Sequence, residues 1–402
     1  MRGLAVGADH PLARGMDPRR AYLERGLFGE SFAEHYAFAA GGWLLERAPG
    51  DLISPEAVVF AWDPRDVEGR FAGACLRGLL RTGAHVLATG ILPAPAAAVY
   101  MAALGAAGAV LLTASHNPAD QNGLKLFRGP DAGKLLPGED AELSARVWAR
   151  SWEEVAGTPE SGVLNETAAE ARAVYAGHIT QLPNCWLRAG DLAAWDIVLD
   201  PARGAWSGLA AEVAAELGPR SLTEANGMAE GPVNEGGGVV ALEGRAAVGG
   251  DEEAVIRAHA GLSRLFEIGR ARAGALRAGE GFAAAGVFDA DGDRAYTLFY
   301  DPFADAVRVL GGDEAIVLQA RFLAAEGELP GGGEEGEGVA VLTIESDAQA
   351  AAALAASGLR VEFAPVGDKW ILRAARRWGE AFALGGEESG HTIAPGLLSD
   401  AL

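Results

Sequence analysis

Short apolar runs alternate with longer amphipathic stretches along most of this 402-residue chain. The runs Val58–Trp62, Ala84–Ala88 and Val110–Leu112 predict buried strands. Between them, Phe71–Thr82 and Pro93–Leu104 predict helices, the second of which begins at prolines that a first helical turn tolerates. This regular alternation predicts a parallel sheet with helices covering its faces.

The same alternation continues through the rest of the chain. Further strands are expected at 197–199, 284–288, 296–300, 339–344, 361–363 and 381–384. Further helices are expected at 32–46, 165–182, 208–217, 311–325, 347–357 and 371–378. Two segments rich in glycine and acidic residues, 226–250 and 327–338, lack periodicity and predict long loops.

Composition narrows the class of protein. The length predicts two to four domains, and the formal net charge of -22 argues against nucleic acid or an anionic membrane as a partner. Two cysteines, Cys75 and Cys185, are too few for a disulfide framework, which fits a reducing cytoplasm. There is no apolar run of membrane-spanning length and no signal-peptide pattern. We therefore expect a cytoplasmic globular protein.

The strand at 110–112 leads into Thr-Ala-Ser-His-Asn-Pro, with Ser115 at its centre. Because Pro118 ends regular pairing, Ser115 should lie on an exposed loop at a strand end, where open α/β sheets place their sites. Lys125 follows a turn signal and can fold back toward the serine. On these residues alone, a turn with ordinary polar side chains explains the pattern equally well.

A second polar loop holds three carboxylates at alternate positions around a glycine, in Asp289-Ala-Asp291-Gly-Asp293. Such oxygens can converge on a hard divalent cation. An EF-hand loop is excluded, because its sixth and twelfth positions would be Arg294 and Tyr300 instead of glycine and glutamate. A solvated acidic turn remains the alternative.

The serine segment, together with the Asn-Gly-Leu-Lys that ends at Lys125, resembles the phosphoserine loop of the α-D-phosphohexomutases. This family includes phosphomannomutase, phosphoglucomutase and phosphoglucosamine mutase. Other family-like segments occur in the family's order at 21–26, 289–294, 366–369 and 385–391. The resemblance implies an α/β protein of three consecutive mixed α/β/α sandwich domains. These would be 1–150 with the phosphoserine loop, 160–302 with the metal loop and 303–402 with the sugar-recognition loop.

The resemblance also implies roles for individual residues. Ser115 would carry the exchanged phosphoryl group and, with the three aspartates of the second loop, would hold Mg²⁺. Arg25, Lys125 and Arg294 would offset negative charge, and Lys125 would also shuttle a proton. The remaining implied site residues are His116, in the catalytic group, and, for the sugar phosphate, Gly367, Asp368, Lys369, Glu387, Ser389 and His391.

The implied activity is the interconversion of hexose 1-phosphate and hexose 6-phosphate through a hexose 1,6-bisphosphate. The segment Gly-Glu-Glu-Ser-Gly-His favours a mannose or glucose enzyme, since glucosamine enzymes more often have glutamine where Glu388 stands. Two alternatives to this activity remain. One is a phosphoglucosamine mutase, and the other is a catalytically degenerate protein that binds sugar phosphates or has a regulatory role.

Family members carry a fourth domain that grips the substrate's non-reacting phosphate, whereas this sequence ends at Leu402, shortly after His391. We therefore expect the fourth domain to be absent and the third to be incomplete at its C-terminus. A fragment, a split enzyme completed by a separate chain and a degenerate protein would each explain this, and the chain alone is expected to turn over only in traces.

Overall fold

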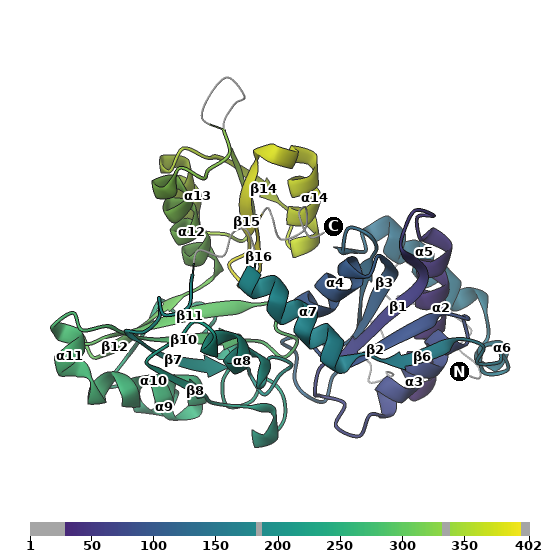
Figure 1. Ribbon diagram of the computed structural model, residues 1–402, viewed down its shortest axis with the longest axis horizontal. Helices are drawn as coiled ribbons and strands as arrows, with labels where there is room; N and C mark the ends of the chain where they lie inside the picture. The colour runs from purple at the N-terminus through teal and green to yellow at the C-terminus, as the bar shows by residue number, and fades with distance from the viewer. Residues whose placement is uncertain (1–28, 182–186, 332–337, 395–402) are drawn as a thin grey trace, which may run out of the picture. The chain divides into compact units, whose positions relative to one another are not determined.

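The structure is a computed structural model that describes residues 29–181, 187–331 and 338–394 (Figure 1). Three separate sheets are present, two of six strands and one of four. The chain divides into two compact units, with the boundary after His178. Each unit is described by itself below.

The sheet of the first unit has the strand order β5-β4-β3-β1-β2-β6. Strands β3, β1, β2 and β6 are parallel, whereas β4 and β5 add an antiparallel edge. The sheet is therefore mixed, where the sequence predicted a parallel one. Its strands are β1 (Ser54–Trp62), β2 (His85–Ile91), β3 (Ala106–Leu112), β4 (Leu124–Arg128), β5 (Gly133–Lys134) and β6 (Val163–Glu166).

Helices cover both faces of this sheet (Figure 1). Val58 and Phe60 of β1 face a core formed with α2 and α3, while α4 contacts β1 and β3 from the opposite face. Every residue of β3 is buried, as expected of a central strand covered on both sides. The helices are α2 (Glu30–Arg47), α3 (Arg70–Leu80), α4 (Ala94–Ala103), α5 (Pro137–Ala149), α6 (Trp152–Ala156) and α7 (Ala168–Gln181).

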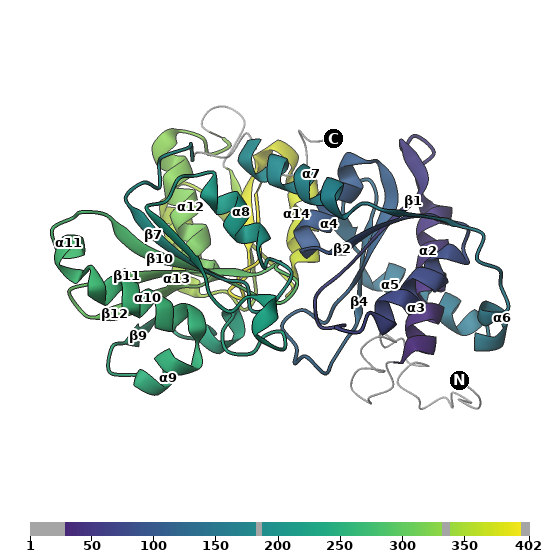
Figure 2. The same cartoon turned by 60° about the horizontal axis from the view of Figure 1, so that its bottom comes forward.

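The six-stranded sheet of the second unit has the order β8-β7-β10-β11-β12-β9. Strands β8, β7 and β10 are parallel, and β10, β11, β12 and β9 form an antiparallel half. Helix α10 covers β7 and β10 through Leu262, Leu265 and Phe266 (Figure 2). The elements are β7 (Trp195–Asp200), α8 (Leu209–Ala215), β8 (Ser221–Glu224), β9 (Ala247–Gly249), α9 (Glu253–Ala258), α10 (Ala260–Ala271), α11 (Ala273–Arg277), β10 (Phe282–Phe288), β11 (Ala295–Asp301) and β12 (Ala306–Leu310).

The third sheet, in the order β14-β13-β15-β16, is a small sandwich of its own. Along β13, Ala340 and Leu342 pack with α12 and α13, whereas Val339 and Val341 pack with α14 on the other face. This alternation explains why β13 is buried along its whole length and apolar from Val339 to Leu342. The elements are α12 (Gly312–Glu326), β13 (Val339–Thr343), α13 (Ala348–Ala356), β14 (Arg360–Ala364), α14 (Asp368–Trp378), β15 (Phe382–Gly386) and β16 (Thr392–Ile393).

Most predicted elements are present, but helices α5 and α6 and strands β4, β5, β8, β12 and β16 were not predicted. Other segments differ from the prediction. Residues 163–166 form the edge strand β6, so the helix expected from 165 begins only at Ala168. The segment 226–250, predicted as a loop, ends in the short strand β9 and buries Val239 and Leu242. The helices between 253 and 277 were not predicted. Within the described residues, no helix combines the length and apolar character needed to cross a bilayer.

Replacing Leu111 of β3 by alanine should lower the free energy of unfolding of the first unit by about 2–5 kcal/mol, because its side chain is fully buried and leaves a cavity. Leu164→Ala on the edge strand β6, where the side chain is 43% exposed, is the matched control and should change it by less than about 1 kcal/mol. Urea unfolding of both variants checks this. Equal losses would contradict the buried position of β3.

Candidate active site

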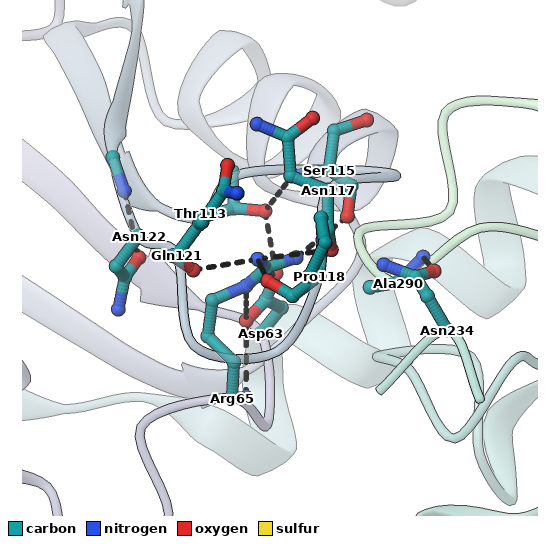
Figure 3. Close-up of polar contacts among 11 residues, drawn as sticks. Asp63, Arg65, Thr113, Ser115, Asn117, Pro118, Gln121, Asn122, Asn234 and Ala290 are labelled. Carbon is teal, nitrogen blue, oxygen red and sulfur yellow. Dashed lines mark hydrogen bonds and ion pairs between the residues drawn. The ribbon is translucent and has the colours of Figure 1, made fainter. Parts of the chain in front are cut away.

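Ser115 lies three residues beyond the carboxyl end of β3, as predicted, in a loop that closes where Thr113 N donates to Gly123 O at 2.9 Å. Its φ is 51°, a left-handed conformation that serine rarely adopts. Its amide donates to Thr113 Oγ1 at 2.8 Å (Figure 3). The loop is exposed at Pro118 and Asp120, as predicted, whereas Ser115 itself is only 8% accessible. The folded-back loop holds its backbone inward.

The sequence patterns did not indicate Asp63 and Arg65, which follow β1 and lie beneath this loop (Figure 3). Their ion pair is fully buried, with Arg65 Nε 2.8 Å from Asp63 Oδ2. Arg65 Nη2 donates to the carbonyl of Ser115 at 2.6 Å. The Asp-Pro-Arg that ends β1 was the available signal, because charged residues directly after a buried strand need partners.

Two other predicted residues lie close to this loop in the fold. Lys125 lies on β4, directly opposite Leu111 of the strand that leads to Ser115. His116 follows the serine and is half-buried. Arg25, the third basic residue expected to face the phosphoryl group, lies outside the described residues.

In the second unit, the three acidic residues lie on the turn between β10 and β11, so the expected hairpin is confirmed. Asp289 and Asp291 are fully buried, and the side chain of Asp293 is 10% exposed. One oxygen of each carboxylate lies within 4.8 Å of the others. Like charges this close repel unless they are compensated. The donor set, three carboxylates and no sulfur, therefore fits a hard cation that takes oxygen ligands.

Two neighbouring loops hold the acidic turn, residues 289–293, through hydrogen bonds to its backbone. Asn234 Oδ1 accepts a hydrogen bond from Ala290 N at 3.0 Å (Figure 3), and Trp206 Nε1 donates to Gly292 O at 3.0 Å. Gly292 has a φ of +69°, and a Cβ there would lie 2.1 Å from Trp206 Cδ1. Only glycine satisfies both conditions. The sequence suggested a tight turn at Gly292 but not its two supports.

The segment 226–250 supplies Asn234 and is itself anchored by a buried polar network. Asp200 Oδ1 accepts from Asn226 Nδ2 at 3.0 Å, and Asp200 Oδ2 lies 3.3 Å from His259 Nδ1. Burial lowers the pKa of His259, although the charge of Asp200 opposes the shift. Arg203 Nε donates to Asn226 Oδ1 at 2.8 Å. The segment is thus a packed support for the acidic turn.

The predicted sugar-recognition loop follows β15 and contacts the acidic turn. His391 Nδ1 lies 2.7 Å from Glu387 Oε2, and His391 Nε2 lies 3.2 Å from Asp293 Oδ1. Glu387 is only 4% exposed, and its other oxygen accepts from Gly367 N at 2.6 Å. One carboxylate therefore joins the 366–369 and 385–391 segments, and one imidazole joins them to the acidic turn.

The start of α12 packs directly against this loop. Gly312 N donates to Glu388 O at 3.1 Å, and a Cβ on Gly312 would lie 1.8 Å from Glu387 O. The Gly-Gly-Asp that begins α12 is thus explained by close backbone approach. Partial desolvation, then the charges of Asp313 and Glu243, raise the pKa of the Glu388 side chain.

The remaining predicted residues of this unit have these positions. Asp368 begins α14, and its carboxylate lies within 4.8 Å of ligand atoms of Asp293 and His391. Lys369 follows in the first turn of the same helix. Ser389 Oγ is 3.4 Å from His391 Nδ1. Arg294 Nη1 lies 3.6 Å from Glu243 Oε1, an anionic partner that the sequence did not indicate.

Comparison with known proteins gives two family-model matches. Residues 19–154 match phosphoglucomutase/phosphomannomutase alpha/beta/alpha domain I, and residues 311–400 match domain III of the same family. A phosphoglucosamine mutase of Rubrobacter xylanophilus is 31% identical over 388 residues, covering 96% of this chain and 72% of the relative. The chain belongs to the α-D-phosphohexomutase family. It is accordingly an enzyme of the intramolecular phosphotransferase class.

Other relatives agree with this membership. A phosphoglucosamine mutase of Renibacterium salmoninarum is 32% identical and covers 92% of this phosphohexomutase chain and 71% of the relative. A solved phosphoglucomutase/phosphomannomutase family protein from Burkholderia thailandensis shares the fold with a TM-score of 0.61 at 20% identity, covering 93% and 72% of the two chains. Parafusin from Paramecium, a phosphoglucomutase in an open form, has a TM-score of 0.59 at 16% identity, covering 95% and 65%. The predicted α/β/α fold of the phosphohexomutases is thereby confirmed.

Gly292→Ala should distort the acidic turn, because the new Cβ meets Trp206. We expect a loss of about 2 kcal/mol or more in the free energy of unfolding of the second unit. Gly279→Ala is the matched control, since Gly279 also has a positive φ (+78°) but nothing within 4 Å of the added Cβ. It should show only the backbone strain, about 1–2 kcal/mol. Urea unfolding of the two variants separates the clash from the strain, and identical losses would refute the close contact.

Proposed function

We propose that this phosphohexomutase interconverts hexose 1-phosphate and hexose 6-phosphate, with Ser115 as the phosphoryl carrier and Mg²⁺ as the cofactor. The observation that carries the proposal is the contact of the acidic turn with the predicted sugar-recognition loop through His391. Phosphoryl transfer to a sugar requires a cation near the phosphoryl group and side chains that bind the sugar hydroxyls, and this contact would place the two next to each other. Family membership supplies the reaction class.

In the proposed reaction the phosphoryl group leaves Ser115 Oγ and joins a hydroxyl of the hexose monophosphate. The bond from phosphorus to Oγ breaks, the bond to the sugar oxygen forms, and the hydroxyl proton is relayed to Ser115 Oγ with Lys125 as the proton shuttle. The bisphosphate then returns its other phosphate to Ser115 by the reverse steps. Such transfers depend mainly on positioning and on neutralising charge.

Different side chains are assigned to charge neutralisation and to substrate binding. Arg25, Lys125 and Arg294 are assigned to the negative charge of the phosphoryl oxygens. Mg²⁺, when held by the three aspartates, would withdraw charge from the same oxygens. The substrate's sugar ring is assigned to Ser389 and Glu387, with Gly367, Asp368 and Lys369 on the adjoining segment.

The identity of the sugar has two candidates. Glu388, in the place where glucosamine enzymes more often carry glutamine, favours mannose or glucose. The curated relatives named above are phosphoglucosamine mutases, which favours glucosamine as the second candidate. Coupled assays with glucose 1-phosphate, mannose 1-phosphate and glucosamine 1-phosphate decide between them. The preferred sugar is the one with the highest kcat/KM.

Mg²⁺ should raise the melting temperature of the wild-type protein, because binding to the folded state stabilises it. Asp291→Asn should remove most of this gain, since Asp291 is fully buried among the converging carboxylates. Differential scanning calorimetry with and without Mg²⁺ measures both. Glu253→Gln, an exposed acidic change away from the turn, is the control and should keep the full gain. Equal gains in all three proteins would show that the turn is not the cation site.

Ser115→Ala should abolish mutase turnover in the protein completed with a fourth-domain segment. The melting temperature should stay within a few degrees of wild type, because one hydroxyl contributes little to stability. Intact-protein mass should show a phosphate after incubation with glucose 1,6-bisphosphate in the wild type only. Undiminished turnover in the variant would refute the carrier assignment. Binding of hexose phosphate without turnover by a folded wild-type protein, even when a fourth-domain segment is supplied as a separate chain, would favour the degenerate, regulatory alternative.

A further inference from the structure

Arg65 donates hydrogen bonds to several backbone carbonyl groups of the serine loop, residues 113–123. Its side chain is 1% exposed, and all three guanidinium nitrogens have partners. Nη2 donates to Ser115 O at 2.6 Å, and Nη1 donates to Gln121 O at 2.8 Å and Pro118 O at 3.3 Å. A guanidinium offers five N–H groups in one rigid plane, so it can hold several carbonyls that a lysine could not reach together.

Asp63 connects this arginine to the other side of Ser115. Its carboxylate accepts from Arg65 Nε at 2.9 and 2.8 Å and from the hydroxyl of Thr113. Thr113 Oγ1 in turn accepts from Ser115 N. Both backbone polar groups of Ser115 are therefore held through one buried network, the amide by Thr113 and the carbonyl by Arg65 (Figure 3).

The conformation of Ser115 gives this network its significance. A φ of 51° is unfavourable for a residue with a Cβ, and it persists only where surrounding contacts enforce it. Holding the two peptide groups that flank the residue also fixes the direction of its Cα–Cβ bond. The position of Cβ, from which the hydroxyl projects, is then set by contacts that do not involve the hydroxyl.

We propose that Asp63, Arg65 and Thr113 form a positioning clamp that aims Ser115 for phosphoryl exchange without touching the substrate. This rests on the proposed role of Ser115 as carrier. Because misplacing a reacting group by about 1 Å can cost on the order of 100-fold in rate, loosening the clamp lowers kcat far more than it changes KM. The hydrogen bonds of the clamp lie within the serine loop and do not depend on substrate. The clamp can therefore also be tested by a measurement that does not require turnover.

The first test uses Thr113→Val and Thr113→Ser in the full chain. Valine has nearly the same shape but no oxygen for the Ser115 amide, whereas serine keeps it. We expect hydrogen exchange at the Ser115 amide to be at least about tenfold faster in Thr113→Val and near wild type in Thr113→Ser. Equal exchange rates in the two variants would overturn the clamp, whatever the activity of the protein.

The second test uses Arg65→Lys, with Arg81→Lys as its control. Arg81 is also largely buried, 14% exposed, and also pairs with a buried carboxylate, Glu34, at 2.8 Å, but away from the serine loop. We expect Arg65→Lys to lower kcat about 10- to 100-fold with KM within about threefold. Arg81→Lys should keep kcat within about twofold even where it lowers the melting temperature equally.

The two tests separate the clamp from the proposed function. One outcome is that Thr113→Val shows faster amide exchange at Ser115, while the wild-type protein neither accepts phosphate on Ser115 nor turns over. This outcome supports the clamp and counts against the proposed function. A folded Arg65→Lys variant with wild-type kcat overturns the clamp while leaving the proposed function in place. A parallel loss of kcat in Arg65→Lys and Arg81→Lys also overturns it, because that would be a general effect of stability.

Discussion

Parallel strand pairing is the constraint on which the candidate site depends. Neighbouring parallel strands end at the same edge of a sheet, so the loops that follow them collect there. In the first unit, Asp63 follows β1 and Ser115 follows β3, its parallel neighbour. In the second unit, Asp200 ends β7 and Asp289 follows β10, again a parallel pair. Each loop of the candidate site is therefore supported by the loop of the adjacent strand.

Burial of charge beneath these loops explains why they hold unusual conformations. An isolated buried charge is costly, and the cost is met only by close partners. The carboxylate of Asp63 has Arg65 and Thr113, and that of Asp200 accepts hydrogen bonds from Asn226 Nδ2 and from the backbone amides of Ala202 and Gly238. Such networks tolerate few substitutions, because removing one partner leaves the other charge uncompensated. The same rigidity keeps Ser115 and the acidic turn in place.

The sequence predicted the alternating strands and helices, because buried strands and amphipathic helices differ in period. It also located the acidic turn and the serine loop by their residue types. It could not show that Arg65 lies under Ser115, or that Asn234 supports Ala290, since these contacts join segments far apart in the chain. The burial of Ser115 within its partly exposed loop could not be predicted for the same reason, since the loop closes over the guanidinium of Arg65.

Transfer of a labelled phosphoryl group from the protein to the sugar tests the central claim most directly. The full chain would be labelled at Ser115 with ³²P from glucose 1,6-bisphosphate, separated from it and mixed with hexose 6-phosphate and Mg²⁺. We expect the label to leave the protein within a single turnover and to appear in hexose bisphosphate. Label that never enters the protein, or that leaves it only as inorganic phosphate, would contradict the assignment of Ser115 as the phosphoryl carrier of a mutase.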